Sequence, residues 1–376
     1  MRYIFYIAFF LIFYIFLGYP IIISVLSYIF PKRITRQSYL PSVSVLLSVY
    51  NEEERIERRI ENLLNLDYPL EKIDFLIGSD GSVDNTNAIL RNFKNKRVRT
   101  FIFPNRKGKP SVLNALAKEA RGDILVFADC RQEWERNSLK ELVKNFVNKK
   151  VGVVSGQIDE GENSFYRTYE NFVRAQEARF DSIPGTCGPF YGLKTELFKN
   201  LPDDTILDDF ILPMNVVRQG FRSVLEPLAI AHDICFALEH EKIRKARTLA
   251  GNFQAFSRYP WLLNPFNNRI WFQTISHKFL RLLLPPCLIL LIISSAVLLK
   301  EGSFFLAFFI LQVIFYSCAF VGKIIESRKI TKPINPITKF LKFAAAFLEL
   351  NWATILGFSS FLTGQAKVTW PKYKKK

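Results

Sequence analysis

The clearest sign of the fold is the stretch VSVLLSVY at residues 43–50. Its apolar and β-branched residues follow one another without a polar face, as in a strand that is buried on both sides of a sheet. Asn51 comes next, as a candidate helix cap, and Ile56, Ile60 and Leu63 then recur at helical spacing. A buried strand followed by an amphipathic helix indicates an α/β fold.

The same alternation continues along the chain. Apolar runs predict further strands at residues 73–79, 98–103, 124–128 and 151–155, with helices beginning near residue 85 and at residues 108–120. Strands that alternate with helices predict a mostly parallel, Rossmann-like sheet with helices on both faces.

Polar residues stand where these strands end. Asn51, Asp80, Asn105 and Asp129 each follow an apolar run, and ligands of parallel sheets bind beyond the carboxyl ends of the strands. An acid after a strand is often only a turn former, so periodicity alone leaves both interpretations open for each acid. Together the four positions predict a crevice of nucleotide size.

Four long apolar segments flank this region, at residues 3–30, 282–299, 303–322 and 343–366. Roughly 20 apolar residues in a helix cross the hydrocarbon layer, so the first three predict transmembrane helices. Segment 3–30 is longer than the apolar part of a cleaved signal peptide, which favours a membrane anchor. The fourth segment contains Glu349, Asn351 and Trp352, and spanning, re-entrant and interfacial paths all stay open for it.

The basic residues predict how the chain is oriented. Arg2 is the only charge before the first segment, whereas PKRITR follows it at residues 31–36. Because cytosolic flanks are rich in Lys and Arg, residues 31–278 are expected in the cytosol and the N-terminus outside. The expected location is the cell membrane, crossed several times.

The chain is strongly basic, with 51 Lys and Arg against 34 Asp and Glu, a formal charge of +17. No nucleic-acid-binding motif accompanies these charges, so nucleic acid is not expected as a partner. Attraction to anionic membrane lipids and binding of a diphosphate substrate explain the excess more simply. The five Cys have no metal-ligand spacing and are expected to be reduced and structural.

Five segments between residues 41 and 233 carry a resemblance to a known family: VSVLLSVYNEEERI, GSDGSVDNT, NRKGKPSVLNALAKEARGDILVFAD, YGLKTELF and DTILDDFILPMNVVRQGF. In this order they resemble the family 2 inverting glycosyltransferases with the GT-A fold. The most similar branch is that of the membrane synthases of cellulose, hyaluronan, chitin and poly-N-acetylglucosamine. The resemblance implies a cytosolic GT-A domain attached to transmembrane helices.

The resemblance also implies a donor site for a UDP-sugar. By position, Asp80 would contact the uracil base and Lys109 the nucleotide or its phosphates. Asp129 would be the first acid of the D-x-D motif, which binds a divalent cation, Mg²⁺ or Mn²⁺, and the diphosphate. Hard oxygen ligands suit these ions, and a cation stabilises the charge that grows on the leaving diphosphate.

On the acceptor side the resemblance implies a general base. Asp209 matches the acid of the T-E-D motif, which deprotonates the acceptor hydroxyl, with Asp208 as its partner; this gives a single displacement with inversion. Gly188 lies in the region that approaches the acceptor, where a glycine allows close contact with the backbone. Trp134 and Trp261 are candidates for stacking on sugar rings or for membrane anchoring.

Two positions depart from the family pattern. Arg131 stands where the second acid of D-x-D is expected, and is predicted to bind phosphate directly. Arg247 matches the pyrophosphate-binding Arg of the Q-x-x-R-W motif, but Thr248 replaces its Trp, which leaves processive synthesis open. Residues 241–258 also have the pattern of an interfacial amphipathic helix, so a membrane-surface role for Arg247 remains an alternative.

These expectations divide the chain into five regions. They are a transmembrane helix at 1–30, a GT-A domain at 31–240, amphipathic interfacial helices at 241–278, two transmembrane helices at 279–322, and a basic loop, fourth segment and basic tail at 323–376. The expected reaction is sugar transfer to a growing polysaccharide or oligosaccharide at the cytosolic face. Single transfer to a lipid-linked acceptor and a non-catalytic membrane subunit are the alternatives, and an oligomer or partner subunit stays open.

Overall fold

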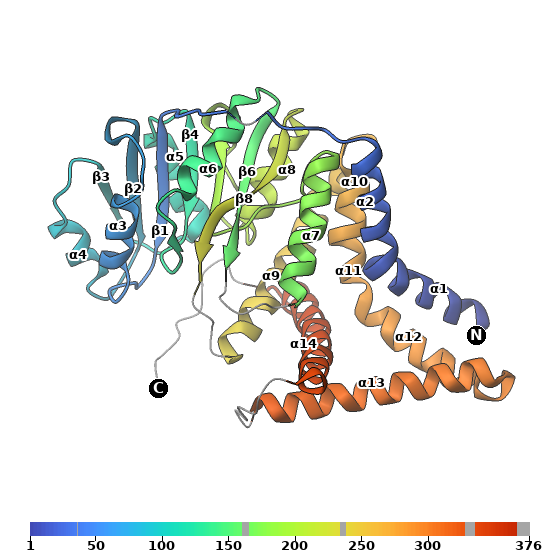
Figure 1. Ribbon diagram of the computed structural model, residues 1–376. Helices are drawn as coiled ribbons and strands as arrows, with labels where there is room; N and C mark the ends of the chain where they lie inside the picture. Colours follow the sequence, from blue (N-terminus) through green and yellow to red (C-terminus); the bar gives the residue numbers. More distant parts are fainter. Residues whose placement is uncertain (36, 160–164, 234–237, 328–334, 367–376) are drawn as a thin grey trace. The chain divides into compact units, whose positions relative to one another are not determined.

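The computed structural model describes the chain except for residues 36, 160–164, 234–237, 328–334 and 367–376 (Figure 1). The chain divides into two compact units. The sheet unit contains Ile23–Phe236 and Arg258–Thr274, and the helical unit contains Met1–Ile22, Ala237–Ser257 and Ile275–Ala366. Each unit has an apolar core of its own.

The sheet unit is built on eight strands in the order β3-β2-β1-β4-β7-β6-β8-β5 (Figure 1). The first four in this order are parallel, β7 is antiparallel to both β4 and β6, β6 and β8 are parallel, and β5 is antiparallel to β8. The strands are β1 (Val43–Val49), β2 (Ile73–Asp80), β3 (Val98–Phe103), β4 (Ile124–Ala128), β5 (Glu133–Trp134), β6 (Val151–Asp159), β7 (Phe190–Lys194) and β8 (Arg222–His232).

The five strands expected from the apolar runs are therefore present, and β5, β7 and β8 are additional. The sheet is mixed, because β7 runs against its neighbours. Strand β1 lies between two parallel partners and its apolar residues are fully buried, which explains its lack of a polar face.

The helices of the sheet unit follow the strands. They are α3 (Ile56–Leu64), α4 (Thr86–Asn92), α5 (Lys109–Glu119), α6 (Ser138–Val143), α7 (Phe165–Phe180), α8 (Asp208–Arg218) and the short α10 (Trp271–Gln273). Helix α5 packs so closely on β2 that a Cβ atom at Gly78 would lie 2.4 Å from a Val112 methyl group. Substitution of Gly78 would therefore displace the helix that begins with Lys109.

Asn51 does not cap the following helix, contrary to the sequence prediction. Helix α3 begins only at Ile56, and Asn51 has a positive φ of 55°. Its side-chain oxygen accepts a hydrogen bond from the backbone N–H of Val83 at 2.9 Å. Asn51 thus links the loop after β1 to the loop after β2. Its positive φ is tolerated because asparagine adopts the left-handed conformation more readily than most residues.

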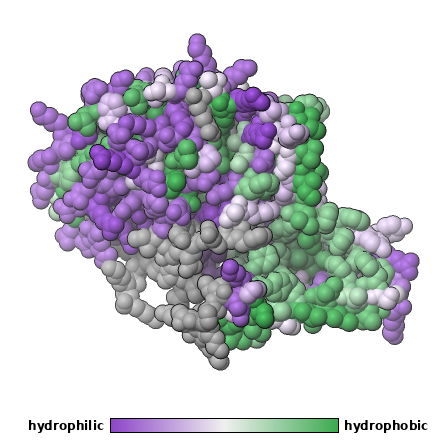
Figure 2. Space-filling view, in the orientation of Figure 1, coloured by the Kyte–Doolittle hydropathy of each residue, from purple (hydrophilic) through white to green (hydrophobic). Residues whose placement is uncertain are grey.

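The helical unit contains the apolar segments (Figure 2). Helix α1 (Arg2–Phe13), a π-helical turn (Tyr14–Gly18) and α2 (Tyr19–Ile29) follow one another, and the last residues of α2 belong to the sheet unit. The others are α9 (Leu238–Arg258), α11 (Leu280–Leu282), α12 (Leu284–Val297), α13 (Ser303–Ser327) and α14 (Pro336–Leu362).

Three helical segments of the described chain are long and apolar enough to cross a membrane: Arg2–Ile29, Ser303–Ile325 and Pro336–Leu362. A fourth candidate, Trp271–Leu282 followed by Leu284–Val297, is bent by 59°. The predicted segments 3–30 and 303–322 thus coincide with straight candidates, and segment 282–299 lies in the second half of the bent pair.

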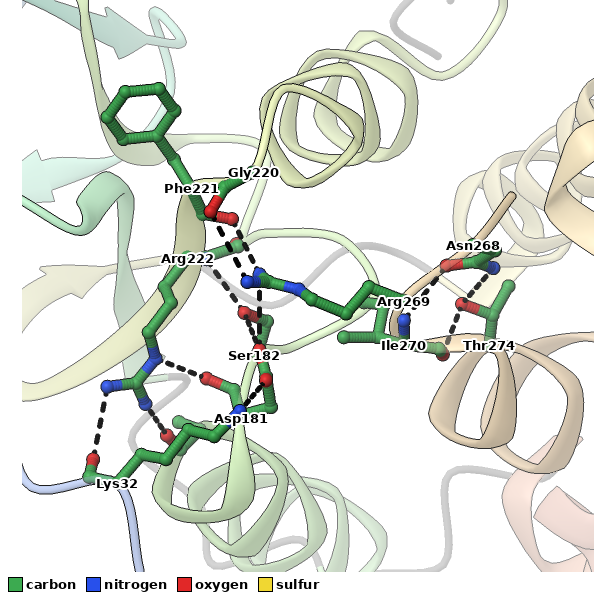
Figure 3. Close-up of polar contacts among 12 residues, drawn as sticks. Lys32, Asp181, Ser182, Gly220, Phe221, Arg222, Asn268, Arg269, Ile270 and Thr274 are labelled. Carbon is green, nitrogen blue, oxygen red and sulfur yellow. Dashed lines mark hydrogen bonds and ion pairs between the residues drawn. The ribbon is translucent and has the colours of Figure 1, made fainter. Parts of the chain in front are cut away.

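A polar cluster around Asp181 fastens distant parts of the sheet unit together (Figure 3). The Asp181 carboxylate is buried at the end of α7, where it pairs with Lys32, with Arg269 at 3.2 Å and with the Ser182 hydroxyl at 2.8 Å. The Arg222 guanidinium donates to the backbone carbonyls of Asp181 at 2.8 Å and Lys32 at 3.1 Å. The cluster therefore fixes the segment after α2 against α7 and β8.

Candidate active site

The donor side of the candidate site lies at the carboxyl ends of β2 and β4. Asp80 is the last residue of β2 and is buried. Its two carboxylate oxygens accept the backbone N–H groups of Lys107 and Gly108 at 2.7 and 2.8 Å. Hydrogen bonds to a carboxylate are among the stronger ones in proteins, so Asp80 holds the loop that leads into α5. Contact between Asp80 and a nucleobase stays a prediction.

Lys109, the first residue of α5, brings two acids together. Its Nζ lies 2.9 Å from Oδ1 of Asp129 and 3.4 Å from Oδ2 of Asp208. Burial would lower the pKa of Lys109, but Asp129 and Asp208 outweigh it and the pKa is raised. Burial would likewise raise the pKa of Asp129, but the Lys109 ammonium outweighs it and the pKa is lowered. Both directions keep the pair charged.

Asp208 and Asp209 occupy the first turn of α8, where the helix dipole stabilises negative charge. Asp208 is buried, and its Oδ2 accepts a hydrogen bond from the Tyr191 hydroxyl at 3.2 Å. Burial and the Asp208 carboxylate both raise the pKa of Tyr191 well above its usual value, so the phenol stays protonated. Asp208 is therefore fixed between Lys109 and Tyr191.

The Asp209 carboxylate has different surroundings, because it lies against Gly188. A Cβ atom at Gly188 would be only 2.8 Å from Oδ2 of Asp209. The backbone oxygen of Asp209 accepts the Thr186 backbone N–H at 2.8 Å and the Thr186 hydroxyl at 3.0 Å. The glycine loop thus fixes the backbone of Asp209, and its carboxylate tolerates only a glycine at position 188.

Arg131 lies just beyond Asp129 and pairs with an acid from another strand. Its Nε donates to Oδ1 of Asp233 at 2.7 Å, and a terminal nitrogen contacts Oδ2 of the same side chain. The Gln132 amide donates to Asp233 at 2.9 Å. This two-point pairing orients the guanidinium after β4. Binding of phosphate by Arg131 stays a prediction.

Several predicted site residues are thus close together, and others are not part of this cluster. Lys109, Asp129 and Asp208 share one ion-pair network, and Gly188 adjoins Asp209. Arg247 belongs to α9 of the helical unit, and its pyrophosphate role stays a prediction.

Trp134 is not available for stacking on a sugar. The indole is only 2% exposed, since it packs on Phe190 at 4.1 Å and under the Arg59 guanidinium at 4.7 Å. Burial raises the pKa of the Cys187 thiol to about 12, which agrees with a packing role and not with a nucleophile.

Tyr191 and Asp233 are the polar groups that sequence analysis missed. Tyr191 lies on β7 and Asp233 directly follows β8, two strands that no apolar run predicted. Tyr191 stands within the motif YGLKTELF, which could have drawn attention to it. A third is Tyr50, whose ring lies 3.6 Å from the Arg106 guanidinium carbon and offers a flat surface after β1.

The described residues fit only one kind of divalent-cation site, in which a single carboxylate acts together with substrate phosphates. Among the described residues, no group of three or more His, Cys, Asp or Glu could hold a metal ion. Mg²⁺, however, is often held by one or two carboxylates together with substrate phosphates and water. Asp129, partly exposed beside Lys109, can supply such a single carboxylate.

Comparison with known proteins agrees with this geometry. Residues 44–201 match the family described as Glycosyl transferase family 2. The probable glycosyltransferase YdaM of Bacillus subtilis is 29% identical over 223 residues, which cover 53% of this chain and 52% of that protein. The poly-beta-1,6-N-acetyl-D-glucosamine synthase of Staphylococcus aureus is 26% identical over 207 residues, 51% of this chain and 49% of that protein. The chain thus matches about half the length of each relative.

A solved structure resembles nearly the whole chain. The mannosyltransferase PcManGT from Pyrobaculum calidifontis, in complex with GDP-Man and Mn²⁺, superposes with a TM-score of 0.73 at 22% identity, covering 96% of this chain and 99% of that one. The mixed sheet and this superposition define the GT-A fold of glycosyltransferases. Over residues 44–201 the chain is similar to the family 2 glycosyltransferases.

Proposed function

We propose that this chain transfers a sugar from a nucleoside diphosphate sugar to an acceptor hydroxyl, with inversion at the sugar. The observation that carries the proposal is the Lys109 ammonium between Asp129 and Asp208, beside a second acid, Asp209, that lies against Gly188. A fixed cation supports a diphosphate leaving group, and a carboxylate at a glycine loop, where a substrate can approach closely, supports a general base.

Lys109, Asp129 and Asp80 form the proposed donor site. The Lys109 ammonium is held in a fixed place by its acids, so it needs no rearrangement when negative charge develops on the leaving diphosphate. A Mg²⁺ or Mn²⁺ ion held by Asp129 would supply further stabilisation of that charge. The loop held by Asp80 and the ring of Tyr50 are placed to border a nucleobase.

UDP-N-acetylglucosamine and UDP-glucose remain the first candidates for the donor. The name of the Staphylococcus aureus relative supports an N-acetylglucosamine donor. GDP-mannose becomes a third candidate, because the similar solved structure contains it together with Mn²⁺.

Asp209 is the proposed base, and Asp208 is a positioning residue. Asp208 is buried and already binds Lys109 and Tyr191, so it orients the ammonium and does not reach the acceptor. Asp209 is less buried and adjoins a residue without a side chain. The Asp209 carboxylate therefore accepts the proton of the acceptor hydroxyl.

The proposed acceptor is a growing saccharide at the cytosolic membrane face. The relative named as a polysaccharide synthase supports a saccharide acceptor. The apolar helices 2–29 and 303–325 and the basic flank after the first one support a multi-pass protein with its sheet unit in the cytosol.

The test is release of nucleoside diphosphate from a panel of UDP- and GDP-sugars by the purified protein in detergent, with Mn²⁺, Mg²⁺ or EDTA. Saccharides and membrane lipids serve as acceptors. We expect Asp209→Asn to lower turnover by about 10²–10⁴-fold with donor affinity retained. Asp203→Asn, a change at an exposed acid in the preceding loop, is the matched control. Full activity of the Asp209 variant would refute the assigned base, and no release from any donor would refute the transferase.

A further inference from the structure

The helix α14 meets a charged helix along most of its second half. Its Glu349 pairs with Lys242 of α9 at 3.2 Å. One step further, the backbones of the two helices approach so closely that a Cβ atom at Gly357 would lie 2.8 Å from the Ala246 carbonyl oxygen. At the far end Phe253 packs on Phe358 and Phe361, with ring centroids 5.0 and 6.3 Å apart. The two helices therefore run side by side in the same direction.

Helix α9 is too polar to cross the hydrocarbon layer. Within about two turns it carries the five charged residues Glu241, Lys242, Arg244, Lys245 and Arg247, and each charge at the centre of a spanning helix is strongly unfavourable. Its contacts with α14 extend over residues 242–253, about 16 Å of helix. The half of α14 that follows Glu349 must then lie at the same depth as this charged helix.

Helix α13, in contrast, meets α14 through its second half, from Phe315 to Gly322. Gly322 approaches the Leu341 backbone so closely that a Cβ atom there would lie 2.1 Å from the carbonyl oxygen. Phe315 contacts both Phe340 and Phe347. Beyond Phe347 the aromatic partners of α14 belong to α9. In Figure 1 α13 runs across the view, while the longer α14 is strongly foreshortened, so the two helices cross and do not form a spanning hairpin.

The outer face of α14 is suited to a lipid surface. Trp352, Ile355, Leu356 and Leu362 are exposed along it, and Lys339 and Lys342 are exposed near its beginning. A helix that lies in the interface buries its apolar face to a depth of about 5–10 Å, with basic groups toward anionic lipids and Trp at the headgroup level. Such a position matches the crossing point in the inner half of α13.

From these contacts we infer that α14 does not cross the bilayer. It lies with α9 in the cytosolic leaflet, and the two helices form one interfacial platform whose apolar face enters the acyl chains and whose basic residues meet anionic headgroups. The inference takes from the proposed function only that the sheet unit is cytosolic, and it counts three crossings, by α1–α2, by the bent segment that ends with α12, and by α13. It places the end of α14 on the cytosolic side, and the sequence after it is rich in Lys, as the positive-inside rule favours there.

The first test is the location of the two ends of the full chain, with an epitope tag at each end, in spheroplasts and in inverted vesicles treated with protease. Three crossings place the tags on opposite sides of the membrane, so that each preparation loses one tag only. Four crossings place them on the same side. Both tags lost in one preparation and protected in the other would overturn the inference, whichever side that is. A protected N-terminal tag in spheroplasts would instead contradict the proposed orientation alone.

The second test compares one charge in two helices. Leu356→Arg places a guanidinium on the exposed face of α14, and Ile310→Arg places it on the exposed face in the middle of α13. We expect Ile310→Arg to lower the membrane-integrated amount at least about tenfold, because a central charge opposes insertion. Leu356→Arg is expected to change it by less than about twofold, because an interfacial helix lets the guanidinium reach the headgroups. Equal losses from both variants would overturn the inference.

Discussion

The two halves of the sheet differ in how their strands follow one another. In the half formed by β3, β2, β1 and β4, each strand is parallel to its neighbour and helices separate the strands along the chain. In the half formed by β7, β6, β8 and β5, strands that are distant in sequence lie side by side and β7 runs in the opposite direction. The first half carries Asp80, Lys109 and Asp129, and the second carries or adjoins Tyr191, Asp208 and Asp209.

This difference matches the two proposed tasks, donor binding and activation of the acceptor. In the parallel half the polar groups follow buried strands at one edge, which is the usual position of a nucleotide site. In the mixed half they come from a glycine loop, an antiparallel strand and a helix start. The Lys109 ammonium touches acids of both halves. If the halves have the proposed tasks, changes confined to one half should affect donor binding and turnover separately.

The largest effect is expected from Gly188→Ala, a change confined to the mixed half. The added methyl group would lie 2.8 Å from the Asp209 carboxylate and would displace it. A displacement of this kind can cost about 100-fold in turnover, while donor affinity should be unchanged. Steady-state release of nucleoside diphosphate and equilibrium donor binding measure the two quantities. Cys187→Ala in the same loop adds no atoms and is the control; weakened donor binding in Gly188→Ala would break the separation.

Lys109→Met should affect both halves, because it leaves Asp129 and Asp208 without their shared cation. Removing one member of a buried ion pair is destabilising, and since Asp129 is partly exposed we expect about 2 kcal/mol of stability to be lost. Donor affinity should fall as well. Thermal unfolding and donor binding report the two effects, and Lys118→Met on the same helix is a matched surface control. An unchanged melting temperature would contradict the ion-pair network.

The same variant predicts a pH dependence of stability. The pKa of Asp129 is lowered in the folded chain, so its contribution is present above the ordinary pKa of an aspartate and is lost as the pH falls through the lowered value. The stability difference between wild type and Lys109→Met should therefore be constant near neutral pH and shrink in acid. Melting temperatures measured between about pH 3 and 7 test this; a difference that grows in acid would contradict it.

A smaller effect is expected from Asp80→Asn, which is confined to the parallel half. The amide removes the charge that accepts two backbone N–H groups, and its own N–H₂ opposes one of them. We expect the ordered conformation of the loop to lose about 1.5 kcal/mol of free energy. This loss corresponds to roughly tenfold weaker donor binding, with turnover at saturating donor nearly unchanged. Titration calorimetry with the nucleoside diphosphate measures the affinity. A lower turnover with unchanged donor affinity would contradict the assignment of Asp80 to donor binding.

The smallest effect is expected from Tyr191→Phe. It removes one hydrogen bond to Asp208 and keeps the ring that stacks on Phe127 at 4.5 Å. One such bond is worth about 1 kcal/mol, which corresponds to roughly fivefold in turnover. An effect as large as that of Asp209→Asn would show that the phenol itself takes part in the reaction.

The same contrast explains what could be predicted from the sequence. The strands β1 to β4 are apolar runs that end in polar residues, so both their positions and the importance of Asp80 and Asp129 were visible. Strand β8 contains Glu226 and Pro227 and its pairing with β6 is irregular, and β7 has a glycine, Gly192, at its centre. Periodicity cannot identify such strands. Nor can it reveal the Arg131–Asp233 pair, since long-range side-chain contacts depend on the folded arrangement.

The residues of the Asp181 cluster are synthesised at widely different times during translation (Figure 3). Lys32 leaves the ribosome early. Its carboxylate partner, Asp181, follows only after α7, and Arg222 and Arg269 are synthesised later still. At about 5–20 residues per second, roughly 10–50 s separate the synthesis of Lys32 from that of Arg269. The contacts among Lys32, Asp181 and Arg222 can form first, and the cluster is complete only once Arg269 has been translated. Release of the polypeptide before Arg269 would leave this cluster incomplete.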